Sequence, residues 1–434
     1  MRFSGFQRTE TNRSRFRVDI SSAPSSVREP TLVVLIVPLL IFIGAAFVPG
    51  VSWAEGPATE IKDIDPIVHE LCGKSVALLG ESPAHGFGKT LEFKVELVHR
   101  LIEECHYNAL FVESGLYDYI NIQKKLKSGQ DVTDSMISAA IGGLWETKEV
   151  QPLIPFLRDK VRAGSVTLGG LDDQIGRGTY ASREMSSDLV EYLQGDERLR
   201  CLAILQKHML WQYTVDAPYS PKDKTQILGC LDQIGARLSQ PGASGAPWTE
   251  EDRAMIDSLK RNFARDFPEG LPKSADQAVM FDNERDRSMY LNFRWLLSGL
   301  PSHSKVIVWA ATTHVAKDLS IVGGLDNRVP LGFYIKQDFK NRAFTLGFSA
   351  YSGNYAMVRQ PVRSLSAAPD NSLEGRSIAE RESDTVYFSG KQLRKFGAVA
   401  ARPLGTNFIT ARWDEVLDGL VVFREERAPE YVHR

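Results

Sequence analysis

The sequence predicts an α/β fold with a mostly parallel central sheet flanked by helices, and a large helical insertion between the third and fourth core strands. Three observations predict it. Short, continuously apolar runs are typical of strands that are buried on both faces of a sheet. The first two runs are separated by an amphipathic helical pattern, and such a strand–helix–strand unit implies parallel pairing. A long stretch, from about residue 183 to residue 300, is almost wholly helical in pattern.

The first half of the predicted sheet comes from four apolar runs, Ser75–Gly80, Asn108–Glu113, Val166–Leu171 and Lys305–Ala310. Between the first two runs, residues 90–105 predict a helix with Thr90 as its cap. Its apolar residues recur at spacings of three and four and so share one face. They are Leu91, Val95, Val98, Leu101, Ile102 and Cys105.

The second half of the predicted sheet follows the helical stretch. Strands are expected at Gly332–Lys336, Ala343–Ser349, Thr385–Phe388 and Leu420–Phe423. Residues 359–384 are polar and rich in Ser, Pro and charge, which predicts a surface loop. The body of the chain, residues 55–434, is therefore expected to form one α/β domain that carries a helical subdomain.

Composition limits the function. The chain has 434 residues, of which 43% are hydrophobic and 24% charged, so a sizeable folded core is expected. Lys and Arg number 52 against 54 Asp and Glu, a net charge of -2. Without a basic excess, a nucleic-acid partner is not expected. The four cysteines show no CxxC spacing, so a structural zinc site is not predicted.

The first 54 residues have the pattern of a targeting segment. Residues 31–48 are uncharged and apolar, and Ser52 and Ala54 occupy the two small-residue positions of a signal-peptidase site. A cleaved signal peptide is the favoured interpretation, and a retained membrane anchor is the alternative, because the run is just long enough to span a bilayer. Either way we expect the domain outside the cytoplasm, periplasmic or secreted, with membrane contact only through residues 31–48 if they are retained.

Export bears on the cysteines. In an oxidising compartment Cys72 with Cys105, and Cys201 with Cys230, become candidates for disulfides, and buried free thiols are the alternative.

Polar residues follow each of the four predicted core strands. Glu81 and His85 follow the first, Glu113 ends the second, Asp172 follows the third and His314 follows the fourth. Ligands of open parallel sheets bind outside the carboxyl ends of the strands, so these side chains are expected to converge. A lone acid after a strand is usually a cap or a solvated loop residue. Two histidines with several carboxylates, however, suit general-base activation of water or the binding of a metal.

Two sharper motifs are rejected. Residues 83–90 (PAHGFGKT) resemble a phosphate-binding loop, but Pro83 replaces the first glycine and lacks the amide that a phosphate needs. Residues 80–84 (GESPA) resemble a nucleophile elbow around Ser82. The oxyanion hole of such an elbow uses the amide after the nucleophile, and Pro83 has none.

The segment from Gly80 to Lys94 resembles the signature block of the erythromycin esterase family. It carries Gly80-Glu81-Ser82, then His85-Gly86-x-Gly88-x-Thr90-x-Glu92-x-Lys94. Further blocks follow in the family's order: Phe111 to Gly115, Trp145 with Glu149, Gly170-x-Asp172-x-Gln174, Arg285-Asp286-x-x-Met289, and Trp309 to Lys317. The similarity spans about residues 62 to 350. One departure concerns spacing: Glu81 and His85 are four residues apart, against the usual three, so the carry-over applies more directly to His85.

The resemblance implies a hydrolase that opens an ester or lactone with water and forms no covalent intermediate. By position, His85 would be the general base, Glu81 or Glu113 would orient its ring, and His314 would hold the other flank of the crevice. Substrate or oxyanion contacts would come from a second set: Arg285, Lys94, Glu92 and Asp172. Structural alternatives are an Arg285–Asp286 ion pair on one helix and a solvated Glu92–Lys94 pair.

We therefore expect a small-molecule ester or lactone substrate. No cofactor is expected, and a metal is not favoured. Macrolide inactivation, and with it antibiotic resistance, is one activity of the family. The alternative hypothesis is an envelope protein on the same scaffold, non-catalytic or binding a metal or haem through its His and Glu side chains. The sequence does not indicate the natural substrate or the oligomeric state.

Overall fold

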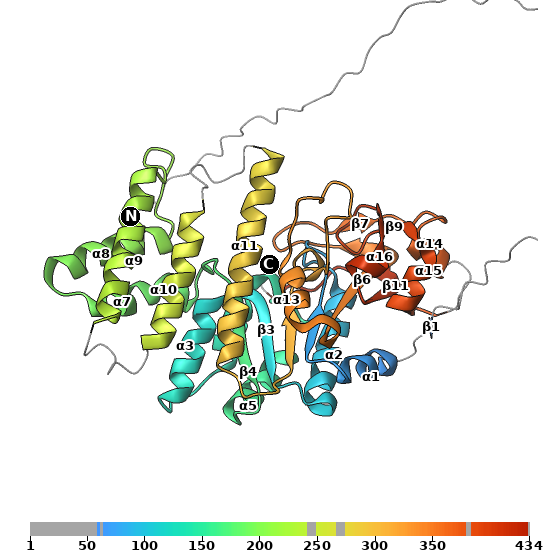
Figure 1. The fold of residues 1–434 in the computed structure, drawn as a ribbon, viewed down its shortest axis with the longest axis horizontal. Coiled ribbons are helices and arrows are strands. Elements are labelled where there is room, and N and C mark those ends of the chain that lie inside the picture. The colour runs from blue at the N-terminus through green and yellow to red at the C-terminus, as the bar shows by residue number, and fades with distance from the viewer. Residues whose placement is uncertain (1–58, 61–63, 241–248, 266–273, 379–382, 433–434) are drawn as a thin grey trace, which may run out of the picture. The chain divides into compact units, whose positions relative to one another are not determined.

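A mixed sheet of mostly parallel strands organises the domain (Figure 1). The structure is a computed structural model, and it describes residues 59–60, 64–240, 249–265, 274–378 and 383–432. The predicted targeting segment, residues 1–54, lies outside the described residues. Within the described part, no helix is long and apolar enough to cross a membrane.

Six parallel strands form the centre of the sheet, in the order β11-β6-β2-β5-β3-β4. Their bounds are β2 Val76–Leu79, β3 Ala109–Gly115, β4 Thr167–Asp172, β5 Val306–Trp309, β6 Ala343–Tyr355 and β11 Gly419–Glu426. Strand β8 (Thr385–Ser389) pairs antiparallel with β11, β1 (Thr59–Glu60) pairs with β8, and β7 (Arg363–Leu365) pairs with β6. Strands β9 (Ala398–Ala401) and β10 (Ile409–Arg412) form a separate hairpin-like pair.

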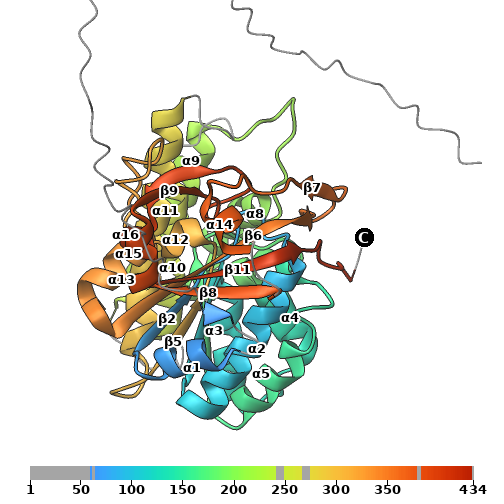
Figure 2. The same ribbon diagram turned by 90° about the vertical axis from the view of Figure 1, so that its right-hand side faces the viewer.

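Both faces of the sheet are buried, as the continuously apolar runs predict. Successive side chains of a strand point to opposite faces. In β2, Ala77 and Leu79 pack into one hydrophobic cluster, whereas Val76 and Leu78 pack into another. The first cluster lies under the helices α1 (Asp65–Cys72), α2 (Gly88–Cys105), α4 (Asp134–Ile141) and α5 (Leu153–Arg162), which lie together in Figure 2. The second is covered by α3 (Leu116–Lys127), α11 (Ala275–Ser298) and α13 (Leu331–Phe339).

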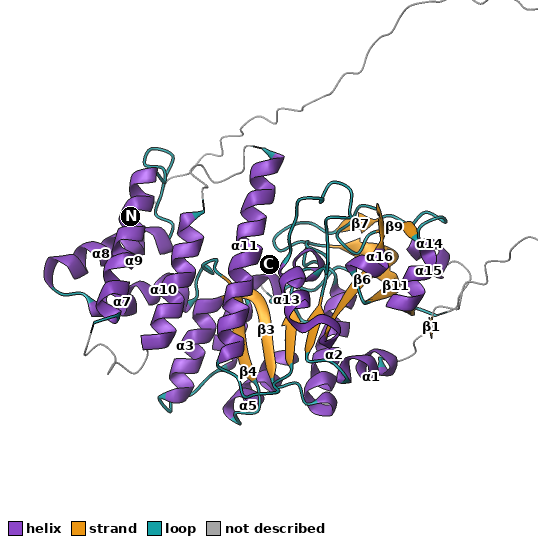
Figure 3. Cartoon of the chain, viewed as in Figure 1, coloured by secondary structure: helices purple, strands orange, loops and turns teal. Residues whose placement is uncertain are grey.

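The segment between β4 and β5 is the predicted helical insertion, which forms the group of helices beside the sheet in Figure 3. It comprises α6 Tyr180–Arg183, α7 Met185–Leu189, η2 Val190–Tyr192, α8 Gly195–Met209, α9 Pro221–Leu238, α10 Thr249–Ala264 and α11. Helix α9 begins with a capping box, in which Ser220 and Asp223 each accept a hydrogen bond from the other's backbone N–H. A disulfide between Cys201 and Cys230 joins α8 to α9.

A second disulfide joins α1 to α2 through Cys72 and Cys105. Both candidate pairs are therefore bonded. The remaining elements are short: η1 Gly143–Trp145, α12 Thr312–Val315, η4 Lys340–Arg342, α14 Leu373–Ile378, α15 Gly390–Phe396 and α16 Trp413–Val416.

Three local predictions are wrong. The strand predicted at Gly332–Lys336 is the helix α13, because Gly332 lies against backbone carbonyls of α12 and Ile335 joins it on the same buried face. Helix α2 begins at Gly88 rather than at a Thr90 cap. The loop predicted at 359–384 includes the strand β7 and the helix α14, whose residues are mostly buried.

Candidate active site

The carboxyl ends of three neighbouring strands set the site. In the sheet register, Leu79 of β2 and Val112 of β3 both lie beside Trp309 of β5. The residues just beyond are therefore brought to one level. The backbone N–H of Ala311 donates to the Glu113 carboxylate at 2.7 Å.

Glu81 and His85 form the first cluster. The Nδ1 atom of His85 lies 3.0 Å from Oε1 of Glu81, and the indole N–H of Trp145 donates to the same oxygen at 2.7 Å. Burial would raise the pKa of Glu81, but the charge of Lys94 and the contact with His85 outweigh burial and lower it. Because Glu81 is then ionised, Nδ1 of His85 carries the proton that faces it, and Nε2 is left as an acceptor.

The backbone at His85 is unusual. Its φ is +49°, the left-handed region that a residue with a side chain seldom adopts. The turn closes through the His85 N–H, which donates to the carbonyl of Ser82 at 2.9 Å. The next residue, Gly86, packs so closely that an added Cβ would lie 2.1 Å from the carbonyl oxygen of Ala356. Strained residues of this kind concentrate at functional sites, where the surrounding structure holds them. The turn accommodates the extra residue between Glu81 and His85.

The start of helix α2, which follows this turn, is held in place by Glu426. The buried carboxylate of Glu426, on β11, accepts from the backbone N–H of Lys89 at 2.6 Å and from the Thr90 hydroxyl at 2.7 Å. It thereby satisfies amides of the first helical turn that have no intrahelical partner. Burial raises the pKa of Glu426 to about 7.

Lys94 is a counter-ion inside the protein. Its side chain is fully buried, with Nζ 3.4 Å from Oε2 of Glu81 and 4.2 Å from the centre of the Trp309 ring. Burial lowers the pKa of Lys94 to about 8, although Glu81 opposes this. The predicted solvated pair with Glu92 is wrong, because Glu92 is exposed and pairs with Arg427 at 3.1 Å. Lys94 is sealed from solvent, and Glu92 is turned toward Arg427.

Glu113, Asp172, Arg285 and His314 belong to the second cluster. The Nη2 atom of Arg285 donates to Glu113 at 3.0 Å and to Asp172 at 2.6 Å. Burial would raise the pKa of Glu113, yet the charges of His314, His85 and Arg285 hold it well below its ordinary value. The contribution of His85 shows that the two clusters act on each other.

His314 is held between two carboxylates. Its Nδ1 lies 2.8 Å from Oδ1 of Asp286 and its Nε2 lies 3.1 Å from Oε1 of Glu113. Burial alone would lower the pKa of His314, but these two carboxylates raise it to about 10. His314 is thus an imidazolium at neutral pH, with both N–H groups engaged. Arg285 approaches the same Nε2 at 3.1 Å, and the surrounding carboxylates offset this contact between cations.

The Arg285–Asp286 ion pair considered from the sequence is not formed as such. Arg285 turns to Asp172 and Glu113, whereas Asp286 turns to His314 and to the backbone N–H of Leu331. Two contributors had no role assigned from the sequence, Trp145 and Asp286. Both lie in the sequence blocks that resemble the erythromycin esterase family, and this resemblance is the one sequence signal that points to them.

Among the residues that the structure describes, no group of three or more His, Cys, Asp or Glu side chains is arranged to hold a metal ion. The carboxylates of the second cluster already face Arg285 and His314.

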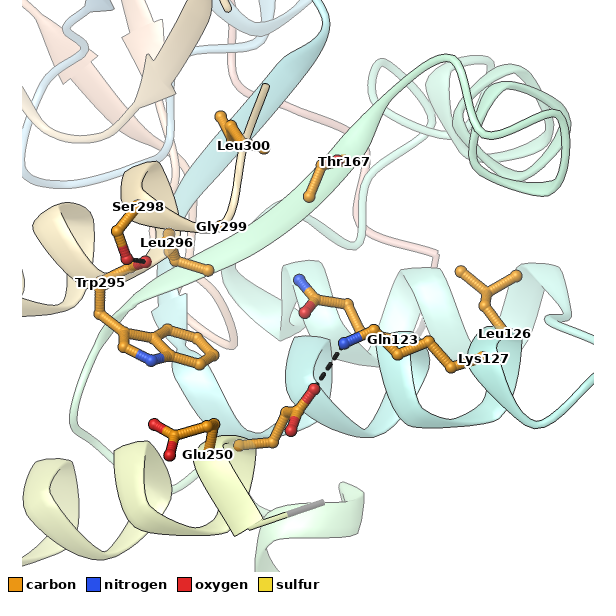
Figure 4. Close-up of a pocket in the computed structure, with 11 residues that line it drawn as sticks. Gln123, Leu126, Lys127, Thr167, Glu250, Trp295, Leu296, Ser298, Gly299 and Leu300 are labelled. Atoms are coloured by element: carbon orange, nitrogen blue, oxygen red, sulfur yellow. Dashed lines mark hydrogen bonds and ion pairs between the residues drawn. The ribbon is translucent and has the colours of Figure 1, made fainter. Parts of the chain in front are cut away.

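Two overlapping cavities, of about 610 and 630 Å³, lie beside the carboxyl end of β4 and share Gln174 and Trp211. A third, of about 460 Å³, is drawn in Figure 4. It includes Thr167, the first residue of β4, and the ion pair of Lys127 with Glu251, so it lies at the opposite edge of the sheet from both histidines.

Comparison with known families gives a match to the family described as "Erythromycin esterase", over residues 102–425. The matched region includes the second cluster and begins within α2, after the turn that carries His85.

A curated relative is the "Putative hydrolase YbfO" of Bacillus subtilis (strain 168), 23% identical over 313 residues, which are 67% of this chain and 68% of the relative. Solved structures show the same fold. One is a protein from Bacillus cereus, with a TM-score of 0.65 and 17% identity over 88% of this chain and 98% of that one. Another is a mutant of the erythromycin esterase EreC in its open conformation, with a TM-score of 0.58 and 16% identity over 84% of this chain and 94% of that one.

Proposed function

This chain belongs to the erythromycin esterase family, and from that premise we propose that it opens an ester or lactone bond with a water molecule activated by His85. The family points to a hydrolase with a small-molecule substrate. The observation that carries the finer proposal is the state of the His85 ring. Glu81 holds Nδ1, and no described residue hydrogen-bonds to Nε2.

In the proposed reaction, Nε2 of His85 removes a proton from water while the water oxygen bonds to the carbonyl carbon. Glu81 stabilises the imidazolium that forms, as the third member of a triad does. The carbonyl oxygen becomes an oxyanion, for which Arg285 is the candidate cation, its side chain 15% exposed beside Glu113. The C–O bond then breaks, and His85 returns its proton to the leaving alkoxide. The products are a carboxylic acid and an alcohol.

A serine nucleophile is the competing mechanism. Ser82 is buried, and the Ala84 N–H lies 3.4 Å from its hydroxyl. Pro83 supplies no amide to an oxyanion beside Ser82, so water attack is the better supported route.

The test is a panel of aryl esters, aliphatic esters and lactones, macrolides included, with two variants. We expect His85→Asn to lose hydrolysis by about 10²–10⁴-fold, because Asn retains a hydrogen bond but takes no proton from water. Ser82→Ala should retain most activity. Circular dichroism checks that both variants fold. An active His85→Asn together with an inactive Ser82→Ala would overturn the mechanism.

We also propose that the domain works outside the cytoplasm. The disulfides Cys72–Cys105 and Cys201–Cys230 support this, because disulfides persist in oxidising compartments. N-terminal sequencing of protein from an envelope fraction should begin near Glu55. A cytoplasmic protein that retains Met1 would contradict export.

A further inference from the structure

An aromatic cleft lies in the helical insertion. We use this name for the two overlapping cavities of about 610 and 630 Å³, whose aromatic lining is His208, Trp211, Tyr219, Phe263 and Phe281. Cavities of about 300–1,000 Å³ are typical of small-molecule sites. The mechanism proposed above uses none of these aromatic residues.

The cleft adjoins the second cluster of the candidate active site through three elements. Gln174, in its lining, follows Asp172 by two residues. Asp282, also in the lining, lies one helical turn before Asp286 on α11. Arg265, just past the end of α10, lines the cleft and forms a buried, bidentate ion pair with Asp173. A molecule in the cleft therefore lies next to the carboxyl end of β4.

Aromatic rings pack against one another in the wall of the cleft. The His208 ring lies 4.5 Å from that of Phe263 and 5.2 Å from that of Tyr219, measured between ring centres, and the first pair is edge-to-face. Burial lowers the pKa of His208 to about 4, so its ring carries no charge at neutral pH. Aromatic rings favour such offset and edge-to-face contacts at about 4.5–7 Å.

Trp211 is the accessible ring of the cleft, with 48% of its surface exposed. It stands just past the end of α8 with φ at +49°, and the next N–H, of Gln212, returns to the carbonyl of Lys207. This is the C-terminal cap position where glycine is usual, because glycine adopts positive φ without steric cost. A tryptophan here keeps a large exposed ring at a backbone position that disfavours it.

Charge limits what the cleft would accept. Two of the rings near the cleft already have a cation above them: Lys207 over Tyr213 at 4.5 Å and Arg265 over Phe281 at 5.1 Å. Arg177, also in the lining, is exposed and has no ion-pair partner among the described residues. Lys207 pairs with Asp223, Arg265 with Asp173, and the lining residue Asp282 with Arg328. Among the described lining residues, Arg177 is therefore the charge left to repel a cationic ligand and to favour an anionic one.

We propose that the aromatic cleft binds the ring-bearing part of the substrate, and that the preferred substrates are esters with a flat aromatic group that is neutral or anionic. That the substrates are esters rests on the proposed function, but binding of the aromatic group does not require hydrolysis. Trp211 would stack on the ring, and the Arg177 side would accommodate an acidic substituent.

Calorimetric titration of the full protein tests the binding directly. The probes are naphthoate, its saturated counterpart decahydronaphthoate, and naphthylmethylammonium. We expect naphthoate to bind more tightly than the other two. Trp211→Ala should weaken naphthoate binding by about two- to tenfold, the range for loss of one aromatic contact, and Trp211→Phe should restore most of it. Leu199→Ala removes an exposed apolar side chain on α8, outside the cleft, and should leave binding unchanged.

Three outcomes would overturn the proposal: no naphthoate binding to the native protein, equal binding of decahydronaphthoate, or unchanged binding in Trp211→Ala. Failure of the proposed function appears elsewhere. The His85→Asn variant should bind naphthoate like the native protein, so a protein that binds the ring but hydrolyses no ester loses only the catalytic proposal.

Discussion

The two histidines at the carboxyl edge of the sheet differ in how many of their nitrogens are engaged. His85 is held at one nitrogen, by Glu81, and lies on a strained turn at the end of β2. His314 is held at both nitrogens, by Asp286 and Glu113, and lies on the short helix α12. The first arrangement leaves a lone pair for chemistry, whereas the second fixes a positive charge.

Residue type and position after a strand are therefore not enough to assign a chemical role to a histidine in this site. Both histidines follow apolar core strands, and the sequence placed them on the two flanks of one crevice. What separates them is the number of carboxylates around each ring. His85 has Glu81, four residues away, whereas the Asp286 and Glu113 beside His314 come from elements remote in the chain. His85 is therefore the candidate base, and His314 the candidate electrostatic support for Glu113.

The largest effect should come from removing the carboxylate beside His85. Glu81→Gln leaves Lys94 buried without its counter-ion, and breaking a buried ion pair from one side costs about 3–5 kcal/mol of unfolding free energy. Activity should fall as well, because the imidazolium of His85 loses its stabilising charge. Urea unfolding and ester hydrolysis measure the two losses.

A double variant separates the two losses. Glu81→Gln with Lys94→Met removes both charges, so stability should largely return while hydrolysis stays low. If the double variant regained activity, Glu81 would have no part in catalysis, and the contrast between the histidines would fail.

A smaller effect should appear in the pH dependence of stability. The folded-state pKa of His314 is raised from 6.5 to about 10, so its contribution to stability is complete below pH 6.5 and is lost as pH rises toward 10. The stability deficit of His314→Asn should therefore be largest near pH 6 and narrow at alkaline pH, as measured by urea unfolding across this range. A deficit that is constant with pH would show that His314 is not held as a cation.

The smallest effect, no change at all, is expected on metal removal. If Arg285 and His314 occupy the carboxylates of the second cluster, as described above, dialysis against a chelator should leave hydrolysis intact. Metal analysis before and after dialysis is the control. Activity lost on chelation and regained on adding a metal would favour the metal-binding alternative and undo the assignment of His314.

The sequence predicts the sheet well because four core strands are short, apolar and followed by polar residues. Glu113 and Asp172 lie in the last residues of β3 and β4, and Glu81 and His314 follow β2 and β5, so parallel pairing brings all four to one edge. The prediction is weakest where tertiary contacts override local pattern. Gly332 suits a strand or a helix until α12 packs against it.

Lys94 shows the same limit within the site. A lysine off the apolar stripe of α2 is normally solvated, and only Glu81 and Trp309, from two different strands' ends, explain its burial. The partners of Asp286 are equally remote, since His314 is 28 residues away along the chain. No spacing rule within one helix connects them.

The hydrogen bonds between Glu426 and the start of α2 have a consequence for biosynthesis. The carboxylate lies 337 residues after Lys89, whose amide it accepts, on the last strand of the sheet. The turn that carries His85 is synthesised early. The contact with Glu426 that holds the adjoining start of α2 can form only when β11 has left the ribosome and paired with β6. A nascent or C-terminally clipped chain would have the histidine without its support, so catalytic competence would be delayed until synthesis of the domain is nearly complete.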